Sequence, residues 1–130
     1  MAITFVLDTS AYSAFNRGDG RLRQWFQDTS QIIVPLVVVG ELRAGFAAGN
    51  KREENELLLQ RFLDAPNVST ATITDRTTKL FAQIYAKLRR AGTPIGTNDL
   101  WIAATTLEHD TSLLTLDSDF ACVPDLLLAS

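Results

Sequence analysis

Apolar and polar positions alternate along the chain in a way that predicts strands and helices in turn. Short apolar runs, several of them rich in β-branched side chains, indicate buried strands at residues 3–7, 31–34, 67–73, 112–116 and 126–128. Between them, helical spacing predicts helices at residues 10–16, 21–28, 35–48, 53–63, 75–91 and 97–109. This alternation predicts an α/β fold, a three-layer α/β/α sandwich with a mainly parallel central sheet. Residues 1–130 are of the size of a single domain.

Two of the predicted helices have informative apolar faces. In residues 53–63, the spacing of Leu57, Leu58 and Phe62 predicts one buried face, with the stem of Arg61 beside it. Residues 35–48 are apolar or small on almost every side, so this helix is expected to be deeply packed, with Pro35 in its first turn.

Two aspartates follow apolar strands directly. Asp8 ends the run at residues 3–7, and Asp117 ends the run at residues 112–116. The carboxyl ends of parallel strands face the crevice where ligands bind, so both carboxylates are placed for chemistry. The alternative for Asp8 is that it caps the following helix, because Asp, Thr and Ser are all good N-cap residues.

Two further acidic residues lie within predicted helices. Asp99 falls in a first helical turn, where the helix dipole favours negative charge whether or not a ligand binds. Glu41 lies inside the apolar helix, where a buried carboxylate needs a compensating partner. Arg43 is a poor candidate because residues two apart on a helix point in different directions. The alternative is that Glu41 reaches the surface.

If Asp8, Glu41, Asp99 and Asp117 converge, their mutual repulsion calls for a divalent cation. Oxygen ligands without His or Cys favour Mg²⁺ or Mn²⁺ over zinc, and such a site suits phosphodiester hydrolysis. Asp119 is an alternative or additional ligand, although we expect it to be a turn aspartate bonded to its own backbone.

Composition narrows the setting. The net charge of -3 and pI near 5.0 supply no global basic field, so nucleic-acid binding must rely on local clusters or metal ions. One cysteine and one histidine form neither a disulfide nor a usual zinc site. Cys122 is expected to be a small packed residue. With no signal segment and no run of transmembrane length, a cytoplasmic protein that is not in the membrane is expected.

Four segments together resemble a known family, the PIN-domain ribonucleases, and more closely the VapC toxins of toxin–antitoxin systems. The likeness spans nearly the whole chain. Its marks are Val-Leu-Asp-Thr-Ser at residues 6–10, Gly-Glu-Leu-Arg-Ala-Gly at 40–45, Thr-Asn-Asp-Leu-Trp-Ile-Ala-Ala at 97–104, and Leu-Thr-Leu-Asp-Ser-Asp-Phe at 114–120. Each motif is weak alone, whereas four in this order are specific.

The resemblance implies a PIN-like fold and an acidic site that holds Mg²⁺ or Mn²⁺ for endonucleolytic RNA cleavage. Its residues are Asp8, Glu41, Asp99 and Asp117. The resemblance also implies a supporting hydroxyl role for Thr115, and for Thr9 or Ser10. A cognate VapB-like antitoxin that blocks the acidic site and a homodimer are implied in the same way.

Residues that contact RNA are harder to single out. The candidates near the crevice are Arg17, Arg21, Arg23 and Arg43, although an arginine of this kind is more often a solvated surface charge. Trp25 and Trp101 are placed to stack on bases or, more commonly, to pack in the core or a dimer interface.

Other functions fit less well. A haloacid-dehalogenase-like phosphatase needs a second aspartate where this chain has Ser10, and a response-regulator receiver needs a different order of acidic residues. A catalytically weak PIN-like module that binds RNA or protein is the remaining alternative.

Overall fold

The computed structural model describes residues 3–129 and contains one five-stranded sheet with the order β3-β2-β1-β4-β5. Every pair of neighbouring strands is parallel. The strands are β1 (Thr4–Leu7), β2 (Gln31–Pro35), β3 (Val68–Ala71), β4 (Ser112–Leu114) and β5 (Leu127–Leu128). Because all strands run the same way, their carboxyl ends meet at one edge of the sheet.

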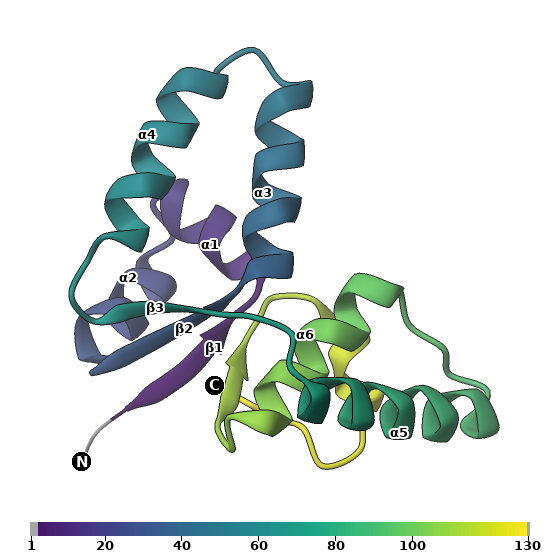
Figure 1. Ribbon diagram of the computed structural model, residues 1–130. Coiled ribbons are helices and arrows are strands. Elements are labelled where there is room, and N and C mark those ends of the chain that lie inside the picture. Colours follow the sequence, from purple (N-terminus) through teal and green to yellow (C-terminus); the bar gives the residue numbers. More distant parts are fainter. Residues whose placement is uncertain (1–2, 130) are drawn as a thin grey trace.

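Helices cover both faces of the sheet, with α1, α2 and α4 on one side and α5 and α6 on the other (Figure 1). Helices α3 and α4 form a hairpin that extends away from the sheet. The helices are α1 (Thr9–Asn16), α2 (Gly20–Asp28), α3 (Leu36–Ala48), α4 (Arg52–Leu63), α5 (Asp75–Ala91), α6 (Thr97–Glu108) and a 3₁₀ helix, η1 (Ser118–Cys122). The predicted α/β/α fold class is confirmed.

The core is built around the central strand β1, whose Phe5, Val6 and Leu7 are fully buried. The Phe5 ring lies 6.0 Å from both Trp25, edge-on, and Phe26 of α2. Phe26 in turn lies 5.8 Å from Phe62 of α4, so aromatic rings join these helices to the sheet. This packing fixes β1, and therefore the backbone that leads into Asp8.

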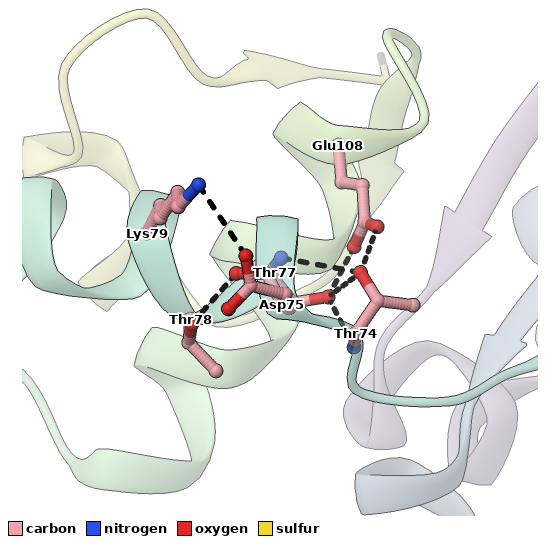
Figure 2. A network of polar contacts seen from close by, with 6 residues as sticks. All are labelled: Thr74, Asp75, Thr77, Thr78, Lys79 and Glu108. Atoms are coloured by element: carbon pink, nitrogen blue, oxygen red, sulfur yellow. Dashed lines mark hydrogen bonds and ion pairs between the residues drawn. The ribbon is translucent and has the colours of Figure 1, made fainter.

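A network of hydrogen bonds connects the start of α5 to the end of α6 (Figure 2). Thr74 caps α5 in a capping box with the buried Thr77. Both hydroxyls donate to the carboxylate of Glu108, Thr74 at 2.6 Å. The Glu108 carboxylate thus faces the N-terminus of α5, where the helix dipole favours negative charge.

The predicted ends of α5 are also confirmed. The helix begins at Asp75 and its C-cap is Gly92, with φ of 73°. Glycine adopts this left-handed conformation without the steric penalty that a Cβ brings.

The predicted apolar face of α4 is wrong. Leu59 is fully buried, whereas Leu57 and Leu58 are 54% and 46% exposed. Phe62 packs against the core as predicted. With three consecutive leucines, the sequence does not determine which one faces inward, and the docking of α4 on β3 and on the aromatic cluster selects Leu59.

The expectation that α3 is deeply packed is also wrong. Val38, Val39 and Leu42 are buried and Phe46 packs against the core, but Gly40 and residues 43–45 are exposed because α3 extends away from the sheet (Figure 1). Pro35 pairs with Ala71 as the last residue of β2 and is the N-cap of α3.

The remaining differences concern the ends of elements. Strand β4 ends at Leu114, two residues earlier than predicted, and Gly96 is the N-cap of α6 in place of Thr97 or Asn98. Across residues 3–129, none of the helices is both long and apolar enough to cross a membrane.

Candidate metal centre

Asp8 lies at the carboxyl end of the central strand and is almost fully buried, with 4% of its surface exposed. Its Oδ2 accepts hydrogen bonds from the Ser10 hydroxyl at 2.8 Å and the Thr115 hydroxyl at 2.7 Å. Within the described chain the carboxylate makes no capping bond to α1, although Asp8 occupies the N-cap position. Two charge-assisted bonds compensate part of the desolvation of this carboxylate.

The hydroxyls of Ser10 and Thr115 extend this contact into a network. They lie 3.2 Å apart and join the start of α1 to the segment after β4. Ser10 Oγ accepts from the backbone N–H of Leu116, and Thr115 Oγ1 accepts from that of Asp117. The backbone that carries Asp117 is therefore held against Asp8.

Glu41 is half-buried on α3 and points back to the start of α1. Its Oε1 accepts a hydrogen bond of 2.8 Å from the hydroxyl of Thr9. Arg43 instead forms an ion pair with Glu56, with Nε 3.2 Å from Oε2. The structure thus supports the expectation that Arg43 does not pair with Glu41.

Three carboxylates converge beside Asp8. Among residues 3–129, Asp99, Asp117 and Asp119 each offer an oxygen within 4.8 Å of the other two. Asp99 is in the first turn of α6, and the other two lie at the start of η1. Burial, followed by the charges of the four other acidic residues of the site, raises the pKa of Asp99 to about 6.

Hydrogen bonds place Asp8 and Glu41 next to the three-aspartate group, although they are outside its 4.8 Å limit: Thr115 bonds to Asp8 and to the N–H of Asp117, and Thr9, which follows Asp8, bonds to Glu41. The structure therefore brings together all four carboxylates predicted from the sequence and adds Asp119. Which of them bind a metal stays a prediction.

The expectation for Asp119 is reversed. Asp117, not Asp119, is the aspartate whose side chain bonds to the local backbone: its Oδ1 accepts from the N–H of Asp119 at 2.9 Å and caps η1. The side chain of Asp119 is exposed and is directed to the carboxylate group. The Asp-Ser-Asp spacing at residues 117–119 allows either arrangement, and the 3₁₀ helix that follows selects this one.

The atoms of this site that could bind a metal are carboxylate and hydroxyl oxygens. Hard divalent cations such as Mg²⁺ and Mn²⁺ prefer oxygen ligands. His109 is at the opposite end of α6, where its Nδ1 lies 2.9 Å from the carbonyl of Thr105. Cys122 is exposed, contrary to expectation, because η1 turns it outward, and its Sγ lies 3.2 Å from the carbonyl of Asp119. The residues present fit an oxygen-ligated cation.

The predicted RNA contacts fall into two groups. Arg43 and Arg21 form ion pairs, Arg21 with Asp19 at 3.5 Å, whereas Arg17 and Arg23 are exposed on and before α2. Trp101 stacks on Phe81 with ring centroids 4.0 Å apart, so it packs between α6 and α5. Trp25 is half-buried in α2.

Ser10 is more central to the site than its position in the sequence indicates. Its hydroxyl contacts Asp8, Thr115 and the Leu116 N–H, which makes it the centre of the network around the buried carboxylate. The only signal for it was its position two residues after the strand-end aspartate. The Glu108 network was not predicted; its only local feature in the sequence is the Thr-x-x-Thr spacing at 74–77, which suits a capping box.

The sequence of this chain is similar to those of known proteins. The family model described as "PIN domain" matches residues 5–126. "Ribonuclease VapC4" of Mycobacterium tuberculosis is 33% identical over 93 residues, which are 72% of this chain and 72% of that protein. "Ribonuclease VapC1" of Rickettsia felis is 32% identical over 125 residues, 93% of this chain and 91% of that protein.

The fold has solved counterparts. The crystal structure of VapBC2 from Rickettsia felis, bound to a DNA fragment from its promoter, aligns with a TM-score of 0.88. The alignment covers 98% of each chain at 23% identity, which shows the shared fold.

Proposed function

Because the chain belongs to the PIN-domain family and, within it, to the VapC ribonucleases, we propose that its acidic site is that of a metal-dependent endoribonuclease. The observation that carries this proposal is the approach of Asp99, Asp117 and Asp119 to within 4.8 Å of one another. Carboxylates this close repel one another, and a divalent cation removes that repulsion. The proposed cation is Mg²⁺ or Mn²⁺, and the proposed substrate is RNA.

In this proposal, Asp8, Asp99 and Asp117 hold the cation, and Asp119 completes the set. Ser10 and Thr115 both donate to Oδ2 of Asp8, which fixes that carboxylate and leaves Oδ1 for the cation. When bound, the cation stabilises the negative charge that develops on the phosphodiester.

Glu41 has the geometry of a general base. The Thr9 hydroxyl fixes Oε1, and no donor within residues 3–129 bonds to Oε2. That oxygen is therefore available to accept the proton of the water that attacks the phosphorus atom. The half-buried position keeps the carboxylate next to the site and still in contact with solvent.

The test is RNA cleavage by the purified protein with Mg²⁺ or Mn²⁺, with and without EDTA. We expect cleavage that EDTA stops and that Asp8→Asn or Asp99→Asn reduces by at least about a thousandfold, while Asp64→Asn, an exposed change on another element, has no effect. Equal cleavage by the Asp99 variant and the parent would show that the site is wrong. RNA binding without cleavage in any metal would favour a binding module.

A toxin role follows from the same family membership. We propose that a VapB-like antitoxin covers the acidic site with a basic side chain, since five clustered carboxylates attract a cation of any kind. The exposed Leu36, Leu57 and Leu58 on α3 and α4 supply apolar surface for a partner or for a homodimer. The proposed place of action is the cytoplasm, where the RNA is.

Expression in a bacterial host tests the toxin role. Growth arrest by the parent protein, relieved by Asp99→Asn and by co-expression of the neighbouring small reading frame, is the expected result. Light scattering of the purified protein tests the homodimer separately. If the protein cleaves RNA in vitro but its expression does not affect growth, the enzymatic proposal is supported and the toxin proposal is contradicted.

A further inference from the structure

A groove runs along α2 and consists of two hollows of about 530 and 340 Å³. Arg21 and Trp25 line both hollows, so they lie where the two meet. The larger hollow extends toward Ile3, and the smaller one extends toward Thr115 and Leu116. The two hollows are therefore neighbours that share the side chains of Arg21 and Trp25.

The smaller hollow is lined in part by residues that are hydrogen-bonded to the acidic site or to its network. Thr115, which lines it, donates the hydrogen bond to Asp8 Oδ2. Leu116, its neighbour in the lining, donates its backbone N–H to Ser10, which also bonds to Asp8. Residues 115 and 116 thus separate this groove from the buried carboxylate of Asp8 by a single segment of chain.

The two residues shared by the hollows suit a nucleic-acid strand. Trp25 is half-buried and held edge-on against Phe5, at an interplanar angle of 87°, so its ring is fixed before any ligand arrives. A rigid aromatic ring beside two open hollows is a stacking platform for bases. The Arg21 side chain is 78% exposed, and its ion pair with Asp19 at 3.5 Å is a weak surface contact that a phosphate can replace.

Local charge is consistent with this occupant. Residues 17–28 contain three arginines and two aspartates, whereas the whole chain has a net charge of -3. Asp19 caps α2 and Asp28 accepts a hydrogen bond of 2.9 Å from the neutral amide of Gln24; both keep their negative charge, so three arginines and two aspartates give this segment a net charge of +1. Arg21 lines both hollows, whereas Asp28 lines only the larger one, so the lining of the smaller hollow contains an arginine and no carboxylate.

We propose that this groove binds an unpaired stretch of the RNA substrate, with a base stacked on Trp25 and the adjoining phosphate bound by Arg21. The proposal rests on the proposed ribonuclease function and assigns it a binding subsite. Only unpaired bases expose the faces that an indole can stack on, so the groove selects single-stranded segments next to the cleaved bond.

Fluorescence in EDTA, where cleavage is stopped, provides the test. In the Trp101→Phe protein, Trp25 is the one remaining tryptophan. We expect an oligoadenylate of about 12 nucleotides to quench its emission, and a duplex of the same length to leave it unchanged.

The affinity for the oligoadenylate provides a second measurement. Relative to the parent protein, Trp25→Leu should raise Kd about 5-fold to about 100-fold, and Trp25→Phe should raise it less. Arg21→Gln should weaken binding and make it less dependent on salt.

Because Trp25 packs on Phe5, the melting temperature of each variant is measured, and Trp25→Phe keeps the test valid if the leucine variant fails to fold. RNA binding without quenching, or an unchanged Kd in Trp25→Phe and Arg21→Gln, would overturn the proposal and leave the groove for an apolar peptide. These results are independent of cleavage. A parent protein that binds RNA with quenching but cleaves none in any metal would contradict the proposed function alone.

Discussion

Thr115 Oγ1 donates a hydrogen bond of 2.7 Å to Oδ2 of Asp8, which precedes it by 107 residues. The bond fixes the orientation of a buried carboxylate that we propose as a metal ligand. Thr115→Val keeps the volume and removes the donor, so we expect Mn²⁺ affinity to fall about 10-fold to 100-fold, as for other partners of metal ligands. Isothermal titration calorimetry measures this directly. Thr115→Ser restores the hydroxyl and should restore most of the affinity; equal affinity in the valine variant would exclude an orienting role.

Asp99 should make stability depend on pH. Its pKa is raised from 3.8 to about 6, so ionisation is less favourable in the folded protein than in the unfolded chain. The free energy of unfolding of the metal-free protein should therefore decrease as pH rises from about 4 to about 6 and stay lower above that range. Asp99→Asn removes this penalty and should stabilise the metal-free protein at pH 7 by on the order of 1 kcal/mol, after allowance for solvent screening.

Urea denaturation in EDTA at pH values near 4 and 7 checks this, with the two proteins expected to be nearly equal at the lower pH. The same shift predicts that metal binding weakens below about pH 6, because protons compete for Asp99. An asparagine variant that is less stable than the parent at neutral pH would contradict the assigned cause.

Asp119 should contribute to metal binding despite its exposure. It lies within 4.8 Å of Asp99 and Asp117, so Asp119→Asn removes one of three adjacent negative charges. We expect metal affinity to fall, less than for Asp99→Asn, with unfolding free energy within about 0.5 kcal/mol of the parent. Asp64→Asn, an exposed aspartate that accepts from Gln60, is the matched control. Unchanged affinity in the Asp119 variant would return it to a structural role.

Much of this site follows from the sequence because strand direction is a strong constraint. An apolar run that ends in Asp8 predicts both a buried strand and a carboxylate at its carboxyl end, and parallel pairing with β4 brings Asp117 to the same edge. Asp99 was predicted at the start of a helix, and its place in the site came from the resemblance to PIN-domain ribonucleases. The inferences for Asp8 and Asp117 depend on backbone direction and not on how side chains pack.

Details that depend on side-chain packing were not predictable. The orientation of Asp117 and Asp119 is decided by the 3₁₀ helix that starts between them, and the sequence of residues 117–119 fits either choice. The exposure of residues 43–45 of α3 depends on how far the α3–α4 hairpin extends from the sheet, which cannot be derived from apolar composition. Glu108 lies 34 residues after Thr74 and 31 after Thr77, so no hydrophobic or helical periodicity in the sequence predicts their contact.

That contact should matter for stability. Burial opposes ionisation of Glu108, but hydrogen bonds from Thr74 and Thr77 outweigh it and lower its pKa. A lowered pKa means that the contribution is present at neutral pH and is lost as pH falls through the folded pKa. Glu108→Ala should lower the unfolding free energy by about 1–3 kcal/mol at neutral pH, because the buried Thr77 hydroxyl loses its acceptor.

Glu54→Ala, in the first turn of α4, serves as the exposed control and should change the unfolding free energy by less than about 0.5 kcal/mol. Chemical denaturation at neutral and acidic pH measures both variants. A Glu108 variant with the stability of the parent at neutral pH would show that the network in Figure 2 adds nothing to the fold.

The leucines of α4 offer a test of which face of this helix is buried. Leu59 is fully buried among core residues, whereas Leu57 is 54% exposed. Leu59→Ala leaves a cavity and should destabilise the protein by about 2–5 kcal/mol, while Leu57→Ala should change the unfolding free energy by less than about 0.5 kcal/mol. Both substitutions replace the same side chain in the same helix, so helix propensity cancels and only burial differs. Equal losses at the two positions would mean that α4 is rotated, or that Leu57 is covered by a second copy of the chain, which measurement at several protein concentrations distinguishes.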